Sequence, residues 1–137
     1  MIERQKIVET ARSYLGTRFK HQGRVKGAGI DCVGLVLCVG AELGLELPRY
    51  LDYSRHPDGK TLQDRLETHM ERIPEAEALP GDVLLFRGKL QPQHVGIISA
   101  PGYLIHAHLS YRKVVEHRID DMWQRLIVAA YRYPGAA

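Results

Sequence analysis

Apolar residues recur at two different spacings along the chain, and the spacing changes near Pro80. In the first part they return every three or four positions, which is typical of amphipathic and buried helices. This pattern predicts helices over about residues 3–15 and 32–44, ended by Gly16 and Gly44. After Pro80 the apolar residues form short runs of the kind found in strands. Helices first and strands second predict an α+β fold.

The segment between these two parts has a looser pattern, and it predicts one surface helix. Four apolar positions at helical spacing carry this prediction: Leu62, Leu66, Met70 and Ile73. Residues that favour turns bracket the helix, at Pro57-Asp58-Gly59 and at Pro74.

Five short strands are predicted after the turn at Pro80-Gly81-Asp82. They cover residues 83–86, 94–98, 103–108, 114–115 and 126–131. Because short connections join them, we expect an antiparallel meander. With neither a repeat nor a linker in the pattern, residues 1–137 are predicted to form a single domain.

Composition and charge exclude several classes of protein. The net charge of +3 is mildly basic, but the chain contains no run of five or six lysines and arginines, so no nucleic-acid partner is predicted. The chain contains no stretch of 18 apolar residues, so insertion into a membrane is not predicted. The first residues lack the apolar region of a signal peptide, so we expect the chain to be made in the cytoplasm.

The most informative motif is Gly29-Ile30-Asp31-Cys32-Val33-Gly34-Leu35-Val36, which places a cysteine at the start of a predicted buried helix. Asp31 is a good N-cap residue, and Cys32 then lies in the first turn. Unpaired N–H groups and the helix dipole favour a thiolate at that position. Cys32 is therefore a candidate nucleophile.

The second cysteine, Cys38, follows six residues later on the same helix. Six residues rotate a helix by about 600°, which leaves the two side chains about 120° from alignment and roughly 9 Å apart along the axis. This geometry is poor for a disulfide, so Cys38 is predicted to be a small apolar residue of the core.

A thiol nucleophile needs a general base, and seven histidines are available. His56, His69 and His117 lie in polar surroundings and are predicted to be surface residues. His94 opens an apolar strand, and His106 lies within the next strand, so a hairpin could bring the two together. Alternation places His108 on the same face as His106. From the residues alone, His106 and His108 are hard to separate as candidates. A purely structural role for His94 and His106 also stays open.

The chain resembles the NlpC/P60 cysteine peptidases, in particular the short, stand-alone type of phage tails and gene transfer agents. Five segments carry the resemblance, in the family's order and at its usual spacing from about residue 5 to the C-terminus. They are Tyr14-Leu15-Gly16-Thr17, Gly29-Ile30-Asp31-Cys32-Val33-Gly34-Leu35-Val36, Pro80-Gly81-Asp82-Val83-Leu84-Leu85-Phe86, His94-Val95-Gly96-Ile97 and Leu104-Ile105-His106-Ala107.

The resemblance implies a papain-like fold, with N-terminal helices packed on an antiparallel sheet, and a triad of Cys32 as nucleophile, His94 as general base and His106 as the residue that orients it. It also implies hydrolysis of amide bonds in peptidoglycan stem peptides, with neither metal nor cofactor. One position departs from the family pattern, because His21 stands where a tyrosine is usual. An imidazole N–H can still donate to an oxyanion, and Gln22 is a second candidate donor or substrate contact.

The same type of protein suggests phage tail proteins as partners, with the chain associated with the virion tail and acting on the cell wall. Three alternatives remain at this point. The triad could serve an amidase or acyltransferase, or the chain could be a structural component of a tail without turnover. A zinc site built from His106, His108, His94 and Cys32 is also possible in principle, although no carboxylate is spaced to support it.

Overall fold

The computed structural model describes residues 1–45, 47, 60–88 and 92–137. Four α-helices and two short 3₁₀ helices are found in this part of the chain: α1 (Arg4–Arg12), α2 (Cys32–Glu42), α3 (Thr61–His69), η1 (Glu75–Glu77), η2 (Leu109–Tyr111) and α4 (Asp121–Leu126). Gly16 and Gly44 follow α1 and α2 with positive φ angles, as expected of residues that end helices.

The sheet has six antiparallel strands in the order β3-β8-β4-β5-β6-β7. Its strands are β3 (Glu71–Ile73), β4 (Val83–Arg87), β5 (Pro92–Ala100), β6 (Tyr103–His108), β7 (Lys113–Arg118) and β8 (Ile127–Arg132). A separate two-stranded pair, β1 (Arg24–Val25) and β2 (Gly29–Ile30), lies in the loop before α2. The α+β prediction is confirmed.

Two details of the predicted fold are wrong. The last strand does not continue the meander beside β7 but returns to pair with β4, after the short helix α4 that the pattern did not reveal. The surface helix ends at His69, and Ile73 lies in β3, because that segment pairs with β8 at the edge of the sheet. The predicted turn at Pro57-Asp58-Gly59 lies outside the described residues.

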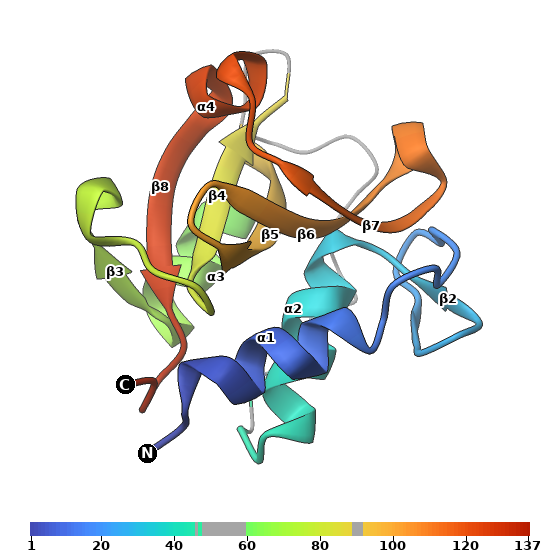
Figure 1. The fold of residues 1–137 in the computed structure, drawn as a ribbon, viewed down its shortest axis with the longest axis horizontal. Helices are drawn as coiled ribbons and strands as arrows, with labels where there is room; N and C mark the ends of the chain where they lie inside the picture. The colour runs from blue at the N-terminus through green and yellow to red at the C-terminus, as the bar shows by residue number, and fades with distance from the viewer. Residues whose placement is uncertain (46, 48–59, 89–91) are drawn as a thin grey trace.

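Each face of the sheet packs into its own apolar core. On one face, α1 and α2 contribute residues such as Ile7 and Leu35, which pack against Val95 and Ile105. On the other face, Trp123 of α4 packs in a second cluster with residues that include Phe86. Figure 1 shows α1 and α2 on one side of the sheet and α4 at its far end. The sheet therefore has no water-facing side at its centre, which explains its nearly continuous apolar strands.

A buried carboxylate joins the two ends of the chain. Asp82 is fully buried and contacts Arg4 at 2.9 Å and Arg132 at 2.9 Å, while one of its oxygens accepts the N–H of Leu79. The turn before β4 is thereby tied to α1 and to β8. No helix in the described part of the chain is long and apolar enough to span a membrane.

Candidate active site

The start of α2 is built around Asp31, which is buried and caps the helix as predicted. Its Oδ1 accepts the N–H of Gly34 at 2.7 Å, which satisfies one of the unpaired donors of the first helical turn. Gly34 must be a glycine here, since a Cβ would lie 2.4 Å from the carbonyl oxygen of Gly23. Cys32 is thus fixed in the first turn, partly exposed.

Asp31 also holds the preceding loop against the helix. Its Oδ2 accepts the backbone N–H of Gln22 at 2.7 Å, and Arg24 forms an ion pair with its Oδ1 at 3.1 Å. Gln22 has a left-handed backbone with φ +61°, which aims its N–H at the carboxylate. The loop that carries His21 is therefore anchored at the start of α2, and the roles of the His21 and Gln22 side chains stay predictions.

The thiol of Cys32 lies against the backbone of β5. Three N–H groups, those of Val95, Val33 and Cys32 itself, face the sulfur and lower its pKa. Burial and the neighbouring carboxylate of Asp31 outweigh them, and together they raise the pKa of the Cys32 thiol to about 12. Burial and the charge of Asp31 therefore oppose the thiolate that the helix terminus favours.

The predicted hairpin of β5 and β6 brings His94 and His106 together. Nε2 of His94 lies 2.6 Å from Nδ1 of His106, and both side chains are buried, with 8% and 0% of their surface exposed. Because Val95 follows His94 directly, the Cys32 thiol lies beside the strand that carries this imidazole. The structure thus brings the two histidines together and places the start of α2 beside β5, the strand that carries His94.

The prediction that His117 is a surface residue is wrong. Its Nε2 lies 2.7 Å from Nε2 of His106, and its Nδ1 lies 2.8 Å from the carbonyl oxygen of Arg118. It is half-buried on β7, two residues beyond Val115, the partner that faces His106 across the two strands. The pair predicted from the sequence is therefore a row of three imidazoles.

Aromatic side chains surround this row. The indole of Trp123 stands edge-on to His106, with ring centres 5.0 Å apart, and to His108 at 5.5 Å. His108 has a separate task, since its Nδ1 accepts the N–H of Ser110 and caps η2. His108 therefore packs beside the row, with its ring centre 4.9 Å from that of His94.

Burial and mutual proximity favour the neutral forms of His94 and His106. Burial, and then the neighbouring histidines, hold the pKa of His94 well below its usual value. The same causes lower the pKa of His106 to about 3. Burial in the site therefore favours the neutral forms of the Cys32 thiol and of the His94 and His106 imidazoles.

The row of imidazoles also bears on the zinc alternative. Both ring nitrogens of His106 already contact other imidazoles, so neither is available to a metal ion. Within the described residues, no group of three or more His, Cys, Asp or Glu side chains is arranged to hold a metal ion.

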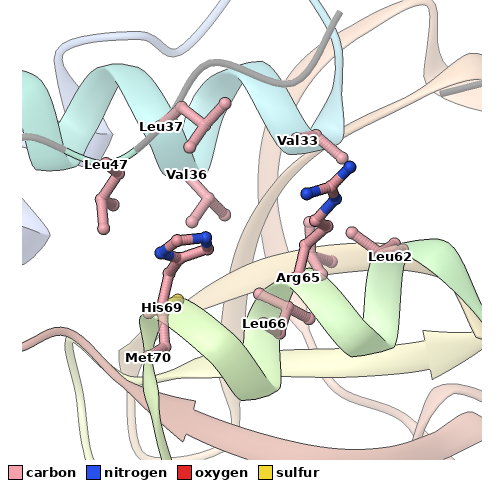
Figure 2. A pocket seen from close by; sticks show the side chains of 10 residues that line it. Val33, Val36, Leu37, Leu47, Leu62, Arg65, Leu66, His69 and Met70 are labelled. Atoms are coloured by element: carbon pink, nitrogen blue, oxygen red, sulfur yellow. The ribbon is translucent and has the colours of Figure 1, made fainter. Parts of the chain in front are cut away.

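An apolar pocket lies between α2 and α3 (Figure 2). Val33 and Val95, which follow Cys32 and His94 in the chain, are part of its lining, and Leu62 and Leu66 of α3 lie opposite α2. His69 also lines this pocket and is half-buried, so its prediction as a plain surface residue is wrong. His56 lies outside the described residues.

Trp123 was not predicted as part of the site, and of the contacts of Asp31 only the cap was predicted. Asp31 was predicted as a cap, but its hold on Gln22 and Arg24 requires the loop to fold back on the helix. Trp123 lies on α4, a helix of only six residues that carries too little periodicity to be seen. A lone tryptophan after a good N-cap, Asp120, was the available signal.

Comparison with known proteins agrees with this architecture. The sequence pattern described as the NlpC/P60 family matches residues 16–132, so the chain belongs to the NlpC/P60 family. Its fold is the papain-like α+β fold of that family.

Individual relatives are distant. The chain is 28% identical, over 123 residues, to the murein DD-endopeptidase MepS/murein LD-carboxypeptidase of Escherichia coli K12; the match covers 89% of this chain and 58% of that protein. This chain therefore spans less than two thirds of that curated relative.

Two solved structures share the fold. A lipoprotein-like NLP/P60 family protein of Staphylococcus aureus has a TM-score of 0.71 and 24% identity, over 94% of this chain and 40% of that chain. The NlpC/P60 domain of the peptidoglycan hydrolase SagA has a TM-score of 0.72 and 21% identity, over 95% of this chain and 98% of that chain.

Proposed function

We propose that this protein is a cysteine peptidase that hydrolyses amide bonds in peptidoglycan stem peptides. The observation that carries the proposal is the buried pair of His94 and His106, 2.6 Å apart, with His94 on β5, the strand against which the Cys32 thiol lies. Membership of the NlpC/P60 family and the names of its murein- and peptidoglycan-cleaving relatives support the substrate class.

In the proposed reaction, Cys32 Sγ attacks the carbonyl carbon of a stem-peptide amide while its proton passes to His94. The imidazolium of His94 then protonates the leaving amine, which leaves a thioester on Cys32. His94 next takes a proton from a water molecule that attacks the thioester, and the acid product leaves with the thiol restored. His106 holds His94 in place throughout, and N–H groups at the start of α2 are suited to stabilise the oxyanion.

Incubation with purified sacculi tests this function. We expect soluble fragments whose masses identify the bond that was cut, and we expect Cys32→Ala to release none. Cys38→Ala is the matched control on the same helix: its Sγ contacts the carbonyl of Arg24 at 3.5 Å, away from the histidines, and its activity should persist.

Each other outcome is informative. Equal loss in the two cysteine variants would contradict the assignment of the nucleophile. Transfer of an acyl group to an added amine without hydrolysis would favour the acyltransferase alternative. An intact protein that releases nothing and transfers nothing would favour the non-catalytic role.

We further propose that the activity belongs to a phage tail or a phage-like particle. The support is the resemblance of the five sequence segments to the short, stand-alone members of the family. Proteomic analysis of purified particles from the source strain tests this setting. Absence of the chain from particles that contain the other tail proteins would contradict it.

A further inference from the structure

Three imidazoles and one backbone carbonyl form a continuous row across β5, β6 and β7. His94 Nε2 is 2.6 Å from His106 Nδ1, His106 Nε2 is 2.7 Å from His117 Nε2, and His117 Nδ1 is 2.8 Å from the carbonyl oxygen of Arg118. Each contact is short enough for a hydrogen bond, so each needs one donor and one acceptor.

The carbonyl at the end of the row decides the direction of every bond. A carbonyl oxygen only accepts, so His117 carries a proton on Nδ1, and in the neutral form of His117 the Nε2 holds a lone pair. His106 must then donate from Nε2, which leaves a lone pair on its Nδ1. His94 in turn must donate from Nε2, and the nitrogen that remains unprotonated is His94 Nδ1.

We propose that His117, oriented by the Arg118 carbonyl, is a positioning residue that sets the tautomer of His94 through His106. The consequence is a lone pair on His94 Nδ1, the nitrogen outside the row, where it can receive the proton of the Cys32 thiol. This inference rests on the proposed function for its catalytic meaning, but the tautomers themselves exist without any substrate.

The surroundings of the row hold its imidazoles in fixed positions. His106 is fully buried, and the neighbouring His108 already accepts the N–H of Ser110 at its Nδ1. Gly96 leaves the room for this packing, since a Cβ there would lie 3.1 Å from Cβ of His106. Neutral imidazoles in fixed positions have only two tautomers each, so one fixed proton at His117 determines the rest.

A first experiment reads the tautomers directly. Nitrogen-15 NMR of the imidazoles near pH 7.5 distinguishes protonated from unprotonated ring nitrogens in the wild-type protein. We expect a proton on Nε2 and none on Nδ1 for His94, the same for His106, and the opposite for His117. A proton on Nδ1 of His94 would overturn the inference, whatever the activity of the protein.

A second experiment reverses the row with a matched pair of variants. The carboxylate of His117→Glu accepts only, so His94 should keep its tautomer and kcat should stay within about threefold of the wild type. The ammonium of His117→Lys donates only, which forces the proton of His94 onto Nδ1. The kcat should then fall by about 10²–10⁴-fold, the scale of general-base catalysis, with a smaller change in KM.

The two experiments separate the inference from the proposed function. A wild-type protein that leaves sacculi intact but shows the expected tautomers would contradict the function alone. An active protein whose folded Lys variant keeps the wild-type tautomers and kcat would contradict the inference alone. If the Lys variant fails to fold, the wild-type spectrum still decides.

Discussion

The two halves of the site are held in place by opposite means. At the start of α2, one charged group holds the surrounding segments together: the Asp31 carboxylate binds two backbone N–H groups and the guanidinium of Arg24. On the sheet, neutral imidazoles hold one another within an aromatic layer. Both arrangements favour the uncharged pair, because Asp31 and burial raise the pKa of Cys32 while burial lowers the pKa of His94.

In this contrast, burial and a neighbouring charge oppose the effect of the helix terminus on the pKa of the Cys32 thiol. The same carboxylate that caps the helix and anchors the loop disfavours a negative charge one residue away. In the proposed reaction, the placement of the base is therefore more important than the acidity of the thiol.

The largest expected effect comes from removal of the proposed base, His94. His94→Ala should lower kcat by about 10²–10⁴-fold, because no other group on the sheet is held to take the proton of Cys32. His108→Ala is the control, since His108 caps η2 and packs against His94 at its ring edge. Steady-state hydrolysis of a purified muropeptide measures both, and equal losses would show that His108 belongs to the reaction.

Removal of the charged anchor comes next. Asp31→Ala should lower the free energy of unfolding by about 3–5 kcal/mol, because it leaves Arg24 and two backbone donors without their buried partner. Denaturant unfolding measures the loss.

Asp31→Asn then separates charge from hydrogen bonding. It removes the charge that raises the pKa of Cys32, so labelling of the thiol by iodoacetamide should reach its midpoint at lower pH than in the wild type. An unchanged midpoint would show that burial alone sets this pKa.

Crowding the sheet half should have a smaller effect. Gly96→Ala would place a Cβ 2.6 Å from Cδ1 of Leu104 and 3.1 Å from Cβ of His106. We expect a loss of about 1–3 kcal/mol in the free energy of unfolding, the usual cost of overpacking, together with a lower kcat. Gly27→Ala is a useful comparison, because a Cβ there meets nothing within 4 Å although its φ of +78° adds backbone strain.

The last expected effect is a gradual dependence of stability on pH. Burial lowers the pKa of His106 to about 3, whereas an unfolded histidine binds its proton near pH 6.5. Its contribution is therefore present in full above pH 6.5 and is lost as the pH falls toward about 3. The expected slope is about 1.4 kcal/mol per pH unit for each such histidine.

Thermal unfolding between pH 7 and pH 4 measures this slope. His106→Phe should flatten it, and Asp31→Asn should leave the part between pH 6.5 and pH 5 unchanged, because it removes no histidine. A slope that persists in full in His106→Phe would assign the effect to other groups.

The sequence predicted the parts of the site that depend on local pattern. The cap at Asp31 and the hairpin of residues 94–98 and 103–108 are coded by neighbouring residues, so the place of Cys32 at the start of α2 and the approach of His94 to His106 were predictable. His117 was not placed with them, because the strand predicted after residues 103–108 covered only residues 114–115. Once β7 is extended to Arg118, alternation places His117 on the face of His106, and that longer strand was the missing signal.

The fold shows the same division. Hairpins between consecutive strands were predictable, whereas the return of β8 to pair with β4 was not, since it depends on contacts between segments more than forty residues apart. Likewise, Asp82 could be read as part of a turn, but its two ion pairs join Arg4 and Arg132, which lie at opposite ends of the chain.

The row of imidazoles ends on a main-chain carbonyl, and this has a consequence for how such a site can evolve. Every amino acid supplies a carbonyl, so the group that fixes the direction of the protons is not encoded by the side chain at position 118. Position 118 can therefore accept other residues as long as the backbone of β7 keeps its path. In that case, the residue type at position 118 would not reveal that its carbonyl group fixes the direction of the protons in the row.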